Sequence, residues 1–289
     1  VPIITTIDED EKIDEAKMRT QVDFVINGGL HGILAYGSNG EFYQIEEDEM
    51  ERGFEIIMDQ AAGRVPVYFG IGAINTKKCV RLAKMAVKHG AAGISILQPM
   101  FLKPNFDELF LHFKTIAESV ADTPVLLYNN PGRVGYTLSA DLVEKLAHEV
   151  DNIVGMKDTS GDITQTEEFI RRNRDVGFKV FGGKDTLLYA SLCIGAVGGV
   201  CTAGNFMPKL IVDIYNKYVS GDISGALEAQ YKLNPVRLAM DVASFPVAAK
   251  DMANMRGQNV GDPYLPNLPT PHGASYDKMK EEMAKAGLL

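Results

Sequence analysis

A lysine that ends a short apolar run is the strongest chemical signal in the sequence. The run from Asn152 to Thr159 is rich in branched residues and glycine and reaches Lys157, a pattern typical of a buried parallel strand, although periodicity alone also allows a piece of helix. At the carboxyl end of such a strand, Lys157 would lie where α/β sheets and barrels bind ligands. Apolar surroundings disfavour the charged ammonium, so the amine could attack a carbonyl carbon. The alternative is a structural lysine in a salt bridge.

Two further stretches place polar side chains directly after predicted strands. In the turn from Gly37 to Glu41, the backbone N–H groups around Ser38 and Asn39 could bind an anion such as a carboxylate. An ordinary turn, in which one of these side chains caps the next helix, is the alternative. Tyr128 ends another strand and could shuttle a proton, and Arg133 nearby could clamp a carboxylate, although a tyrosine in this position is more often structural.

These residues need a framework that gathers strand ends at one edge. Strand patterns occur at residues 3–6, 32–36, 65–71, 93–98, 125–128, 153–157, 179–181 and 196–201. Amphipathic helical patterns lie between them at 15–27, 46–60, 76–89, 106–120, 140–149, 164–174 and 187–194. Eight right-handed βαβ units of this kind predict an α/β fold, a (β/α)₈ TIM barrel. A doubly wound open sheet is the alternative, which the lack of a GxGxxG fingerprint disfavours.

The pattern changes after residue 207. Helices are predicted at 210–219, 223–231, 235–254 and 275–286, with a proline-rich extended loop at 263–271 and no strand between them. We therefore expect a barrel catalytic domain over residues 1–207 and a C-terminal helical appendage over residues 208–289.

Composition excludes several classes of partner. The formal net charge of -9 argues against nucleic acid and anionic membranes, because both require a concentrated basic surface. No apolar run reaches the roughly 18 to 20 residues that span a bilayer, and Val1-Pro2-Ile3-Ile4 lacks a charged leader. We expect a soluble, unexported, cytoplasmic protein.

The cysteines and histidines favour neither a disulfide framework nor a metal site. Cys79, Cys193 and Cys201 have no CxxC spacing, which indicates reduced, buried thiols in a cytoplasmic protein. The five histidines show no metal-binding spacing and are expected to be solvated or to cap helices. They are His31, His89, His112, His148 and His272.

Taken together, the three polar stretches resemble one family. The turn Gly37 to Glu41, the Y-N-x-P motif at Tyr128 to Pro131 and the G-x-K-D motif at Gly155 to Asp158 resemble the dihydrodipicolinate synthase and N-acetylneuraminate lyase family of pyruvate-dependent class I aldolases. The order and separations of the motifs fit over essentially the whole chain, including the helical tail.

The resemblance implies a Schiff base between Lys157 and the keto carbon of pyruvate or another 2-oxo acid. It implies Tyr128 as the proton shuttle, Ser38 and Asn39 as the carboxylate site, and the main chain of Gly183 and Val200 as the floor of the site. It also implies a homotetramer built as a dimer of dimers. No metal or organic cofactor is expected, because the lysine imine itself acts as the electron sink.

The subfamily is harder to predict. Synthases of this family usually carry P-Y-Y where this chain has Pro99-Met100-Phe101, so a hydroxyl of their proton relay is missing, whereas Arg133 resembles the synthase residue that binds the semialdehyde carboxylate. The segments 37–42, 154–158 and 195–201 resemble 4-hydroxy-2-oxoglutarate aldolases, and 204–208 resembles 2-keto-3-deoxy sugar acid aldolases. We therefore place cleavage of a 4-hydroxy-2-oxo acid slightly ahead of dihydrodipicolinate synthesis. Neuraminate cleavage comes last.

Two hypotheses from other classes remain. A catalytically silent protein could use the same pocket to bind an oxo acid, since a fold alone does not establish activity. A nucleotide-binding α/β protein is the other, and the missing glycine fingerprint speaks against it.

Overall fold

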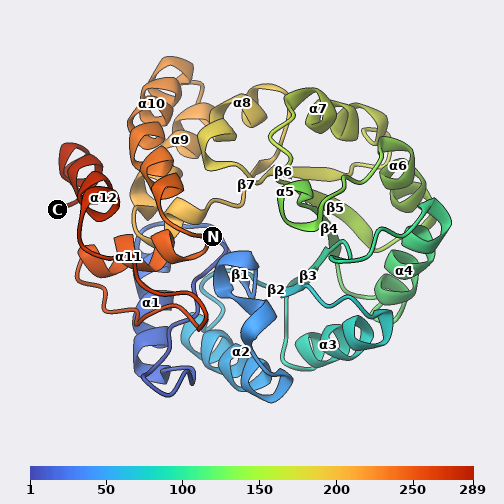
Figure 1. The fold of residues 1–289 in the computed structure, drawn as a ribbon. Helices are drawn as coiled ribbons and strands as arrows, with labels where there is room; N and C mark the ends of the chain where they lie inside the picture. The colour runs from blue at the N-terminus through green and yellow to red at the C-terminus, as the bar shows by residue number, and fades with distance from the viewer. The chain divides into compact units, whose positions relative to one another are not determined.

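The computed structural model describes residues 1–289, which fall into two units (Figure 1). One unit combines residues 1–66 with 201–289, and the other is the continuous segment 67–200. The boundary expected after residue 207 stays a prediction. None of the helices is long and apolar enough to cross a bilayer.

Parallel strands form the centre of the unit 67–200. They follow chain order as β2 (Val67–Ile71), β3 (Gly93–Leu97), β4 (Val125–Asn129), β5 (Ile153–Asp158), β6 (Lys179–Gly182) and β7 (Gly198–Gly199). All five residues of β3 are buried, as expected for a parallel sheet between helices and a filled interior. A Cβ on Gly155 would lie 2.3 Å from the carbonyl oxygen of Lys179, so glycine there permits β5 to approach β6.

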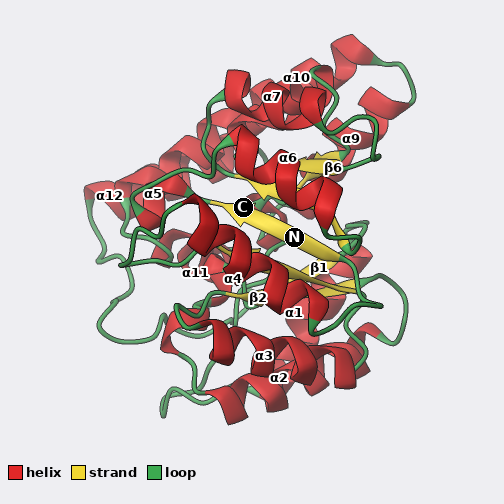
Figure 2. Cartoon of the chain, turned by 90° about the vertical axis from the view of Figure 1, so that its right-hand side faces the viewer, coloured by secondary structure: helices red, strands yellow, loops and turns green.

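Helices cover the outer face of this sheet (Figures 1 and 2). They are α3 (Thr76–Lys88), α4 (Phe106–Glu118), α6 (Ala140–Glu149), α7 (Ile163–Arg172) and α8 (Leu188–Cys193). The short helix α5 (Pro131–Val134) lies inside this ring of helices, beside the strands (Figure 1). Their starts follow local chemistry, since the side chains of Asn75, Ser139 and Asp162 accept hydrogen bonds from the first turns of α3, α6 and α7. Asn105 and Glu108 form a capping box at α4.

The other unit is mostly helical. It contains α1 (Glu15–Asn27), β1 (Ile33–Ala35) and α2 (Glu47–Ala61), followed after residue 200 by α9 (Pro208–Val219), α10 (Ile223–Ala239), α11 (Val247–Met255) and α12 (Ala274–Lys285). Helix α10 packs against both α9 and α12 (Figure 1).

The predicted strand at residues 3–6 is wrong, because the segment forms only isolated bridges on either side of it, a parallel one between Pro2 and Leu34 and an antiparallel one between Ile7 and Ile13. A buried side chain takes over part of the pairing. The N–H of Ile4 donates to Asn205 Oδ1 at 3.0 Å, and Asn205 Nδ2 donates to the carbonyl of Pro2 at 2.9 Å. One asparagine amide therefore satisfies main-chain groups that a regular ladder would otherwise pair.

The predicted break between residues 231 and 235 is also wrong. Helix α10 continues through Pro235 although an internal proline removes a hydrogen bond and costs about 3 kcal/mol. Leu233 and Val236 are buried on either side of it. The buried apolar face therefore keeps the helix intact through Pro235. The single helix predicted at 235–254 is wrong as well, because α10 ends at Ala239 and a separate helix, α11, begins at Val247.

Two side chains differ in burial from the sequence-based prediction. Cys193 is exposed at the end of α8, whereas Cys79 and Cys201 are buried as expected. His112, expected to be solvated or capping, is buried in α4, where its Nδ1 lies 2.8 Å from Thr76 Oγ1 and its Nε2 has no hydrogen-bond partner. It therefore joins α3 to α4.

Acid should weaken the fold through His112. Burial lowers the pKa of His112 from 6.5 to about 4, so the unfolded chain takes up the proton first as the pH falls. Between pH 6.5 and 4 the native state should lose up to about 3 kcal/mol through this group. Urea unfolding at both pH values tests this. A His112→Leu variant should lack this part of the pH dependence, and an unchanged dependence would contradict the assignment.

Candidate active site

Tyr128 and Lys157 lie side by side at the carboxyl edge of the unit 67–200. They are register partners on β4 and β5, and both are buried, with 5% and 4% of their surface exposed. Lys157 Nζ lies 4.3 Å from the centroid of the Tyr128 ring. The strand and the position predicted for Lys157 are thus confirmed, as is the strand end predicted for Tyr128.

Lys157 has no anionic partner. Its Nζ makes no salt bridge with a carboxylate and no hydrogen bond within the described chain, residues 1–289. A buried lysine that only stabilised the fold would be expected to have such a partner, because burying an isolated ammonium costs several kcal/mol. The salt-bridged alternative is therefore wrong, and the amine lies over the face of the Tyr128 ring.

The neighbouring Asp158 has a different role. Its carboxylate accepts hydrogen bonds from Asn129 Nδ2 at 2.8 Å, Ser160 Oγ at 2.9 Å and Thr166 Oγ1 at 2.5 Å, as well as from the N–H of Ser160 at 3.1 Å. These four donors satisfy the carboxylate, which therefore joins β4, β5 and α7. The strand end that carries Lys157 is therefore held rigidly.

A second group of amides fixes the end of β4. Gln98 Nε2 donates to Asn129 Oδ1 at 3.2 Å and to the carbonyl of Tyr136 at 2.8 Å, while Gln98 Oε1 accepts the N–H of Asn130 at 3.0 Å. Asn130 Nδ2 in turn donates to the hydroxyl oxygen of Tyr128 at 2.8 Å. The tyrosine is therefore positioned by a continuous chain of buried hydrogen bonds.

Gly183 and Val200 follow β6 and β7 at the same edge. The N–H of Gly183 donates to the carbonyl of Asp158 at 2.7 Å, and the N–H of Val200 to the carbonyl of Gly182 at 2.8 Å. A Cβ on Gly183 would lie 2.0 Å from Thr159 Oγ1 and 2.9 Å from the carbonyl oxygen of Asp158. Only glycine allows this approach, so the backbone itself forms the wall beside β5.

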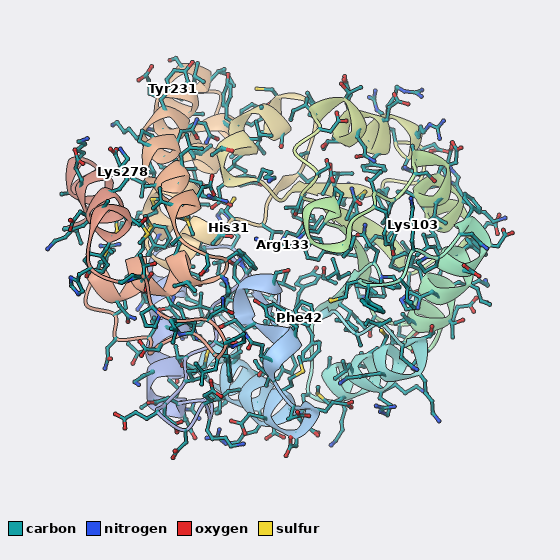
Figure 3. All side chains as sticks on the ribbon, viewed as in Figure 1. His31, Phe42, Lys103, Arg133, Tyr231 and Lys278 are labelled. Carbon is teal, nitrogen blue, oxygen red and sulfur yellow. The ribbon has the colours of Figure 1, made fainter.

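Arg133 is exposed on the short helix α5, which begins directly after β4 (Figure 3). Pro131 starts the helix, where its missing N–H costs nothing, and Gly135 ends it in the left-handed conformation with φ 85°. The structure therefore brings the predicted residues Tyr128, Lys157, Gly183 and Val200 to one strand edge and places Arg133 on the helix that follows β4.

Ser38 and Asn39 belong to the other unit. They form a single 3₁₀ turn, Ser38–Gly40, in which both side chains are buried with 6% exposed. Their main-chain N–H groups donate to no acceptor in the chain, and neither side chain caps α2, which begins after Glu46. The capping alternative is therefore wrong. Asn39 Nδ2 donates to Thr202 Oγ1 at 2.8 Å, which fixes the amide.

A buried ion pair links this turn to the C-terminal helical region. Glu41, in the left-handed conformation with φ 54°, places Oε2 2.6 Å from Lys250 Nζ on α11, and the two side chains are 0% and 1% exposed. Glu41 Oε1 accepts the N–H of Tyr264 at 3.0 Å, and Lys250 Nζ donates to the carbonyl of Asp262 at 2.8 Å. Desolvation raises the pKa of Glu41 and lowers that of Lys250, while their mutual attraction opposes both shifts.

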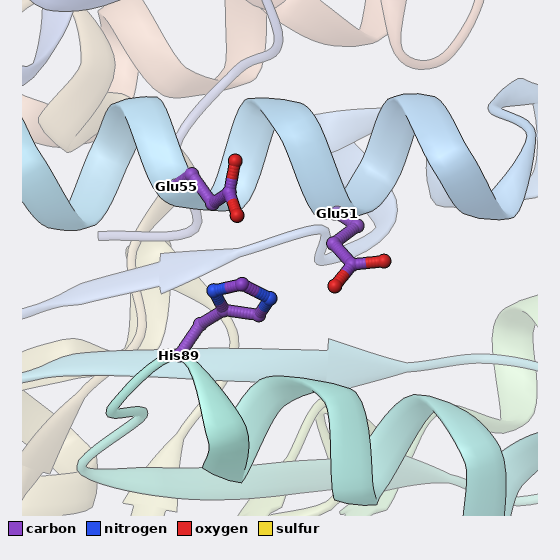
Figure 4. Close-up of side chains that lie close together, drawn as sticks. All are labelled: Glu51, Glu55 and His89. Atoms are coloured by element: carbon purple, nitrogen blue, oxygen red, sulfur yellow. The ribbon is translucent and has the colours of Figure 1, made fainter.

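Glu51 and Glu55 occupy successive turns of α2 in one unit, and His89 directly follows α3 in the other (Figure 4). Acidic side chains at this spacing are common on helix surfaces without an ion. We assign them no role in the chemistry.

The sequence analysis missed Gln98, Asn130 and Lys250 as positioning residues. Gln98 could have been found, because it is a polar residue directly after the apolar strand β3. A lysine inside the apolar stretch of α11 was a similar signal. The partner of Asn130 depends on side-chain direction and has no signature in the sequence.

Comparison with known proteins agrees with this geometry. Residues 1–286 match the Dihydrodipicolinate synthetase family. The chain is 34% identical over 288 residues to the 4-hydroxy-tetrahydrodipicolinate synthase of Methanopyrus kandleri, covering 99% of this chain and 95% of that protein. It is 36% identical over 266 residues to the enzyme of the same name from Methanoculleus marisnigri, covering 91% and 90%.

Solved structures are also similar. A dihydrodipicolinate synthase from Cyanidioschyzon merolae with lysine bound has a TM-score of 0.95 at 26% identity, covering 100% of this chain and 97% of that one. A prophage protein of the same family from E. coli K12, in complex with pyruvate, has a TM-score of 0.95 at 27% identity, with the same coverage. These likenesses confirm the predicted fold class, a (β/α)₈ TIM barrel with a C-terminal helical appendage.

The motifs around Lys157 and Tyr128, the fold and the family match lead to the same assignment. The chain is an enzyme of the lyase and aldolase type, and it belongs to the Dihydrodipicolinate synthetase family.

Proposed function

We propose that the chain condenses pyruvate with aspartate semialdehyde, the 4-hydroxy-tetrahydrodipicolinate synthase reaction, through an imine on Lys157. The observation that carries the proposal is the buried Lys157 amine, which has no ion-pair partner and lies 4.3 Å from the ring centroid of Tyr128. The names of the relatives support the choice of the second substrate. They favour the synthase over the aldol cleavage that the sequence analysis placed slightly ahead.

The chemistry begins with attack of the Lys157 amine on the keto carbon of pyruvate, and loss of water leaves a protonated imine. Loss of a proton from the methyl carbon gives an enamine, which attacks the aldehyde carbon of the semialdehyde. The aldehyde oxygen takes up a proton and becomes the 4-hydroxyl group. The substrate amino group then attacks the imine carbon, which closes the ring and releases Lys157. The net reaction releases one water and needs neither metal nor organic cofactor.

The remaining residues have supporting roles in the proposal. Tyr128 carries protons to and from the reacting oxygen and nitrogen atoms. Ser38 and Asn39 bind the carboxylate of pyruvate, Arg133 binds that of the semialdehyde, and the main chain of Gly183 and Val200 forms the floor. The main-chain N–H groups of Ser38 and Asn39 have no acceptor in the chain and could donate to an anion. This supports the proposed role of the turn in binding the carboxylate of pyruvate.

Aldol cleavage of a 4-hydroxy-2-oxo acid is the second candidate, and Phe101 favours it. This side chain is 94% exposed on a backbone with φ 68°, and it offers no hydroxyl to a proton relay. A weaker relay would slow the synthase more than a cleavage that uses Tyr128 alone.

The proposal also includes a homotetramer, which the family resemblance supports, and a cytoplasmic location, which the cysteine content supports.

A paired assay tests these alternatives. Purified protein is given pyruvate with aspartate semialdehyde, and separately 4-hydroxy-2-oxoglutarate and a 2-keto-3-deoxy sugar acid with pyruvate release coupled to a dehydrogenase. We expect kcat/KM for the condensation to exceed that for either cleavage by at least about 10-fold, a difference of about 1.4 kcal/mol. Faster cleavage would reverse the assignment. Pyruvate binding with no activity and no borohydride-trapped adduct would favour the silent binding protein.

A further inference from the structure

We infer that Asn130 is a positioning residue that sets the direction in which Tyr128 delivers its proton. The inference rests on the proposed function. Asn130 Nδ2 donates to Tyr128 Oη at 2.8 Å, and both side chains are buried, with 6% and 5% exposed. In the Y-N-x-P motif Asn130 occupies the unspecified position, so the contact belongs to this chain and not to the motif.

The direction of this hydrogen bond decides what the tyrosine can do. An amide N–H only donates, so Asn130 Nδ2 cannot accept the phenolic proton. Tyr128 must therefore direct its own O–H away from Asn130, toward another acceptor. Lys157, the register partner of Tyr128 on the next strand, has its Nζ 4.3 Å from the centroid of the same ring. A ligand bound covalently to Lys157 would therefore meet a Tyr128 hydroxyl whose proton already points away from Asn130.

The position of Asn130 in the fold excludes an ordinary capping role. It is the N-cap residue of α5, yet its side chain makes no capping hydrogen bond. Asn75 and Asn105, the N-cap residues of α3 and α4, both use their side chains to accept from their own helices. The amide of Asn130 is directed to the tyrosine instead, although asparagine at this position normally stabilises the helix start.

The main chain of Asn130 is also fixed by hydrogen bonds. The N–H of Asn130 donates to Gln98 Oε1 at 3.0 Å, and Gln98 is fixed by Asn129 and by the carbonyl of Tyr136. Asn129 donates to the fully bonded Asp158. Gln98, Asn129 and Asp158 thus fix the main chain from which the Asn130 side chain reaches Tyr128, so the donor is in place before a ligand arrives.

The donor also stabilises the charge that develops on Tyr128 during proton transfer. When the phenol gives up its proton, negative charge develops on Oη, and a hydrogen bond to a charged oxygen is about twice as strong as one to a neutral oxygen. Asn130 therefore stabilises the state formed during proton transfer more than the resting state. Such an interaction changes kcat more than it changes substrate binding.

Two variants test the inference. Asn130→Leu removes the donor at similar volume, and Asn130→Asp, nearly isosteric, replaces the donor with acceptor oxygens that would draw the phenolic proton toward themselves. We expect Asn130→Leu to lower kcat for the condensation by about 10-fold with KM changed less than about 3-fold. Asn130→Asp should lower it further. Asn105→Leu is the matched control, because it removes an N-cap side chain from α4 and should leave kcat unchanged.

A double-mutant cycle separates positioning from a general loss of structure. In a Tyr128→Phe background the hydroxyl is absent, so Asn130→Leu should cause no further loss in the rate at which the borohydride-trapped pyruvate adduct forms. Independent losses in both backgrounds would overturn the inference, as would wild-type kcat in Asn130→Leu and Asn130→Asp. If the wild-type protein itself forms no adduct, the proposed function fails first. If it does and the cycle is additive, only the role of Asn130 fails.

Discussion

Replacing Lys157 with methionine should lower kcat by at least about 10³-fold, because no other group can supply the covalent electron sink. Methionine has a similar length and no charge, so it should fill the buried position without disturbing β5. Turnover of pyruvate with aspartate semialdehyde measures the loss. Urea unfolding should show that the variant is at least as stable as the wild type, since an unpaired buried amine has been removed.

Covalent trapping gives an independent readout of the same change. Borohydride added with pyruvate should attach one carboxyethyl group to the wild-type protein, and peptide mapping should locate it at Lys157. The Lys157→Met variant should gain no mass. Lys179→Met is the control, because Lys179 is an exposed lysine on β6, and it should keep both adduct and turnover. An adduct on another lysine, or full turnover in Lys157→Met, would contradict the role of this residue.

Replacing Lys250 with methionine should destabilise the protein by about 3–5 kcal/mol, because it leaves the Glu41 carboxylate buried without its cation. The same change leaves the carbonyl of Asp262 without its donor. Equilibrium unfolding in urea at a fixed protein concentration measures the loss. KM for pyruvate should rise as well, since Glu41 directly follows the turn of Ser38 and Asn39.

The double variant Glu41→Gln with Lys250→Met is the control for this explanation. Removing both charges avoids the isolated carboxylate, and glutamine keeps an oxygen that can accept the N–H of Tyr264. It should recover most of the lost stability. If the double variant is as unstable as Lys250→Met alone, the loss comes from packing and not from the unpaired charge.

The sequence predicted most of the helices because their signals are local. Residues 15–27 and 140–149 have the predicted bounds, and the side chains of Asp14 and Ser139 cap them. The errors arose where distant packing decides the outcome. The bonds of residues 3–6 go partly to Asn205, and the buried face of α10 carries the helix through Pro235.

The candidate site follows the same division. Lys157 and Tyr128 could be predicted because the carboxyl ends of parallel strands meet at one edge, and alternation alone identifies those ends. The pair of Glu41 and Lys250 could not, since its members come from distant parts of the chain. Nor could the bond from Asn130 to Tyr128, because it depends on how one side chain turns from a helix start.

Asn205 has a consequence for how the protein is made. Its side chain binds Pro2 and Ile4, and its carbonyl accepts from Gln21 and Gln258, so one residue ties the two ends of the chain into a single unit. During synthesis residues 1–66 cannot complete their packing until residues 201–289 have emerged, whereas the continuous segment 67–200 can assemble from sequential βα pairs beforehand. Residues 67–200 should therefore acquire protease resistance before residues 1–66.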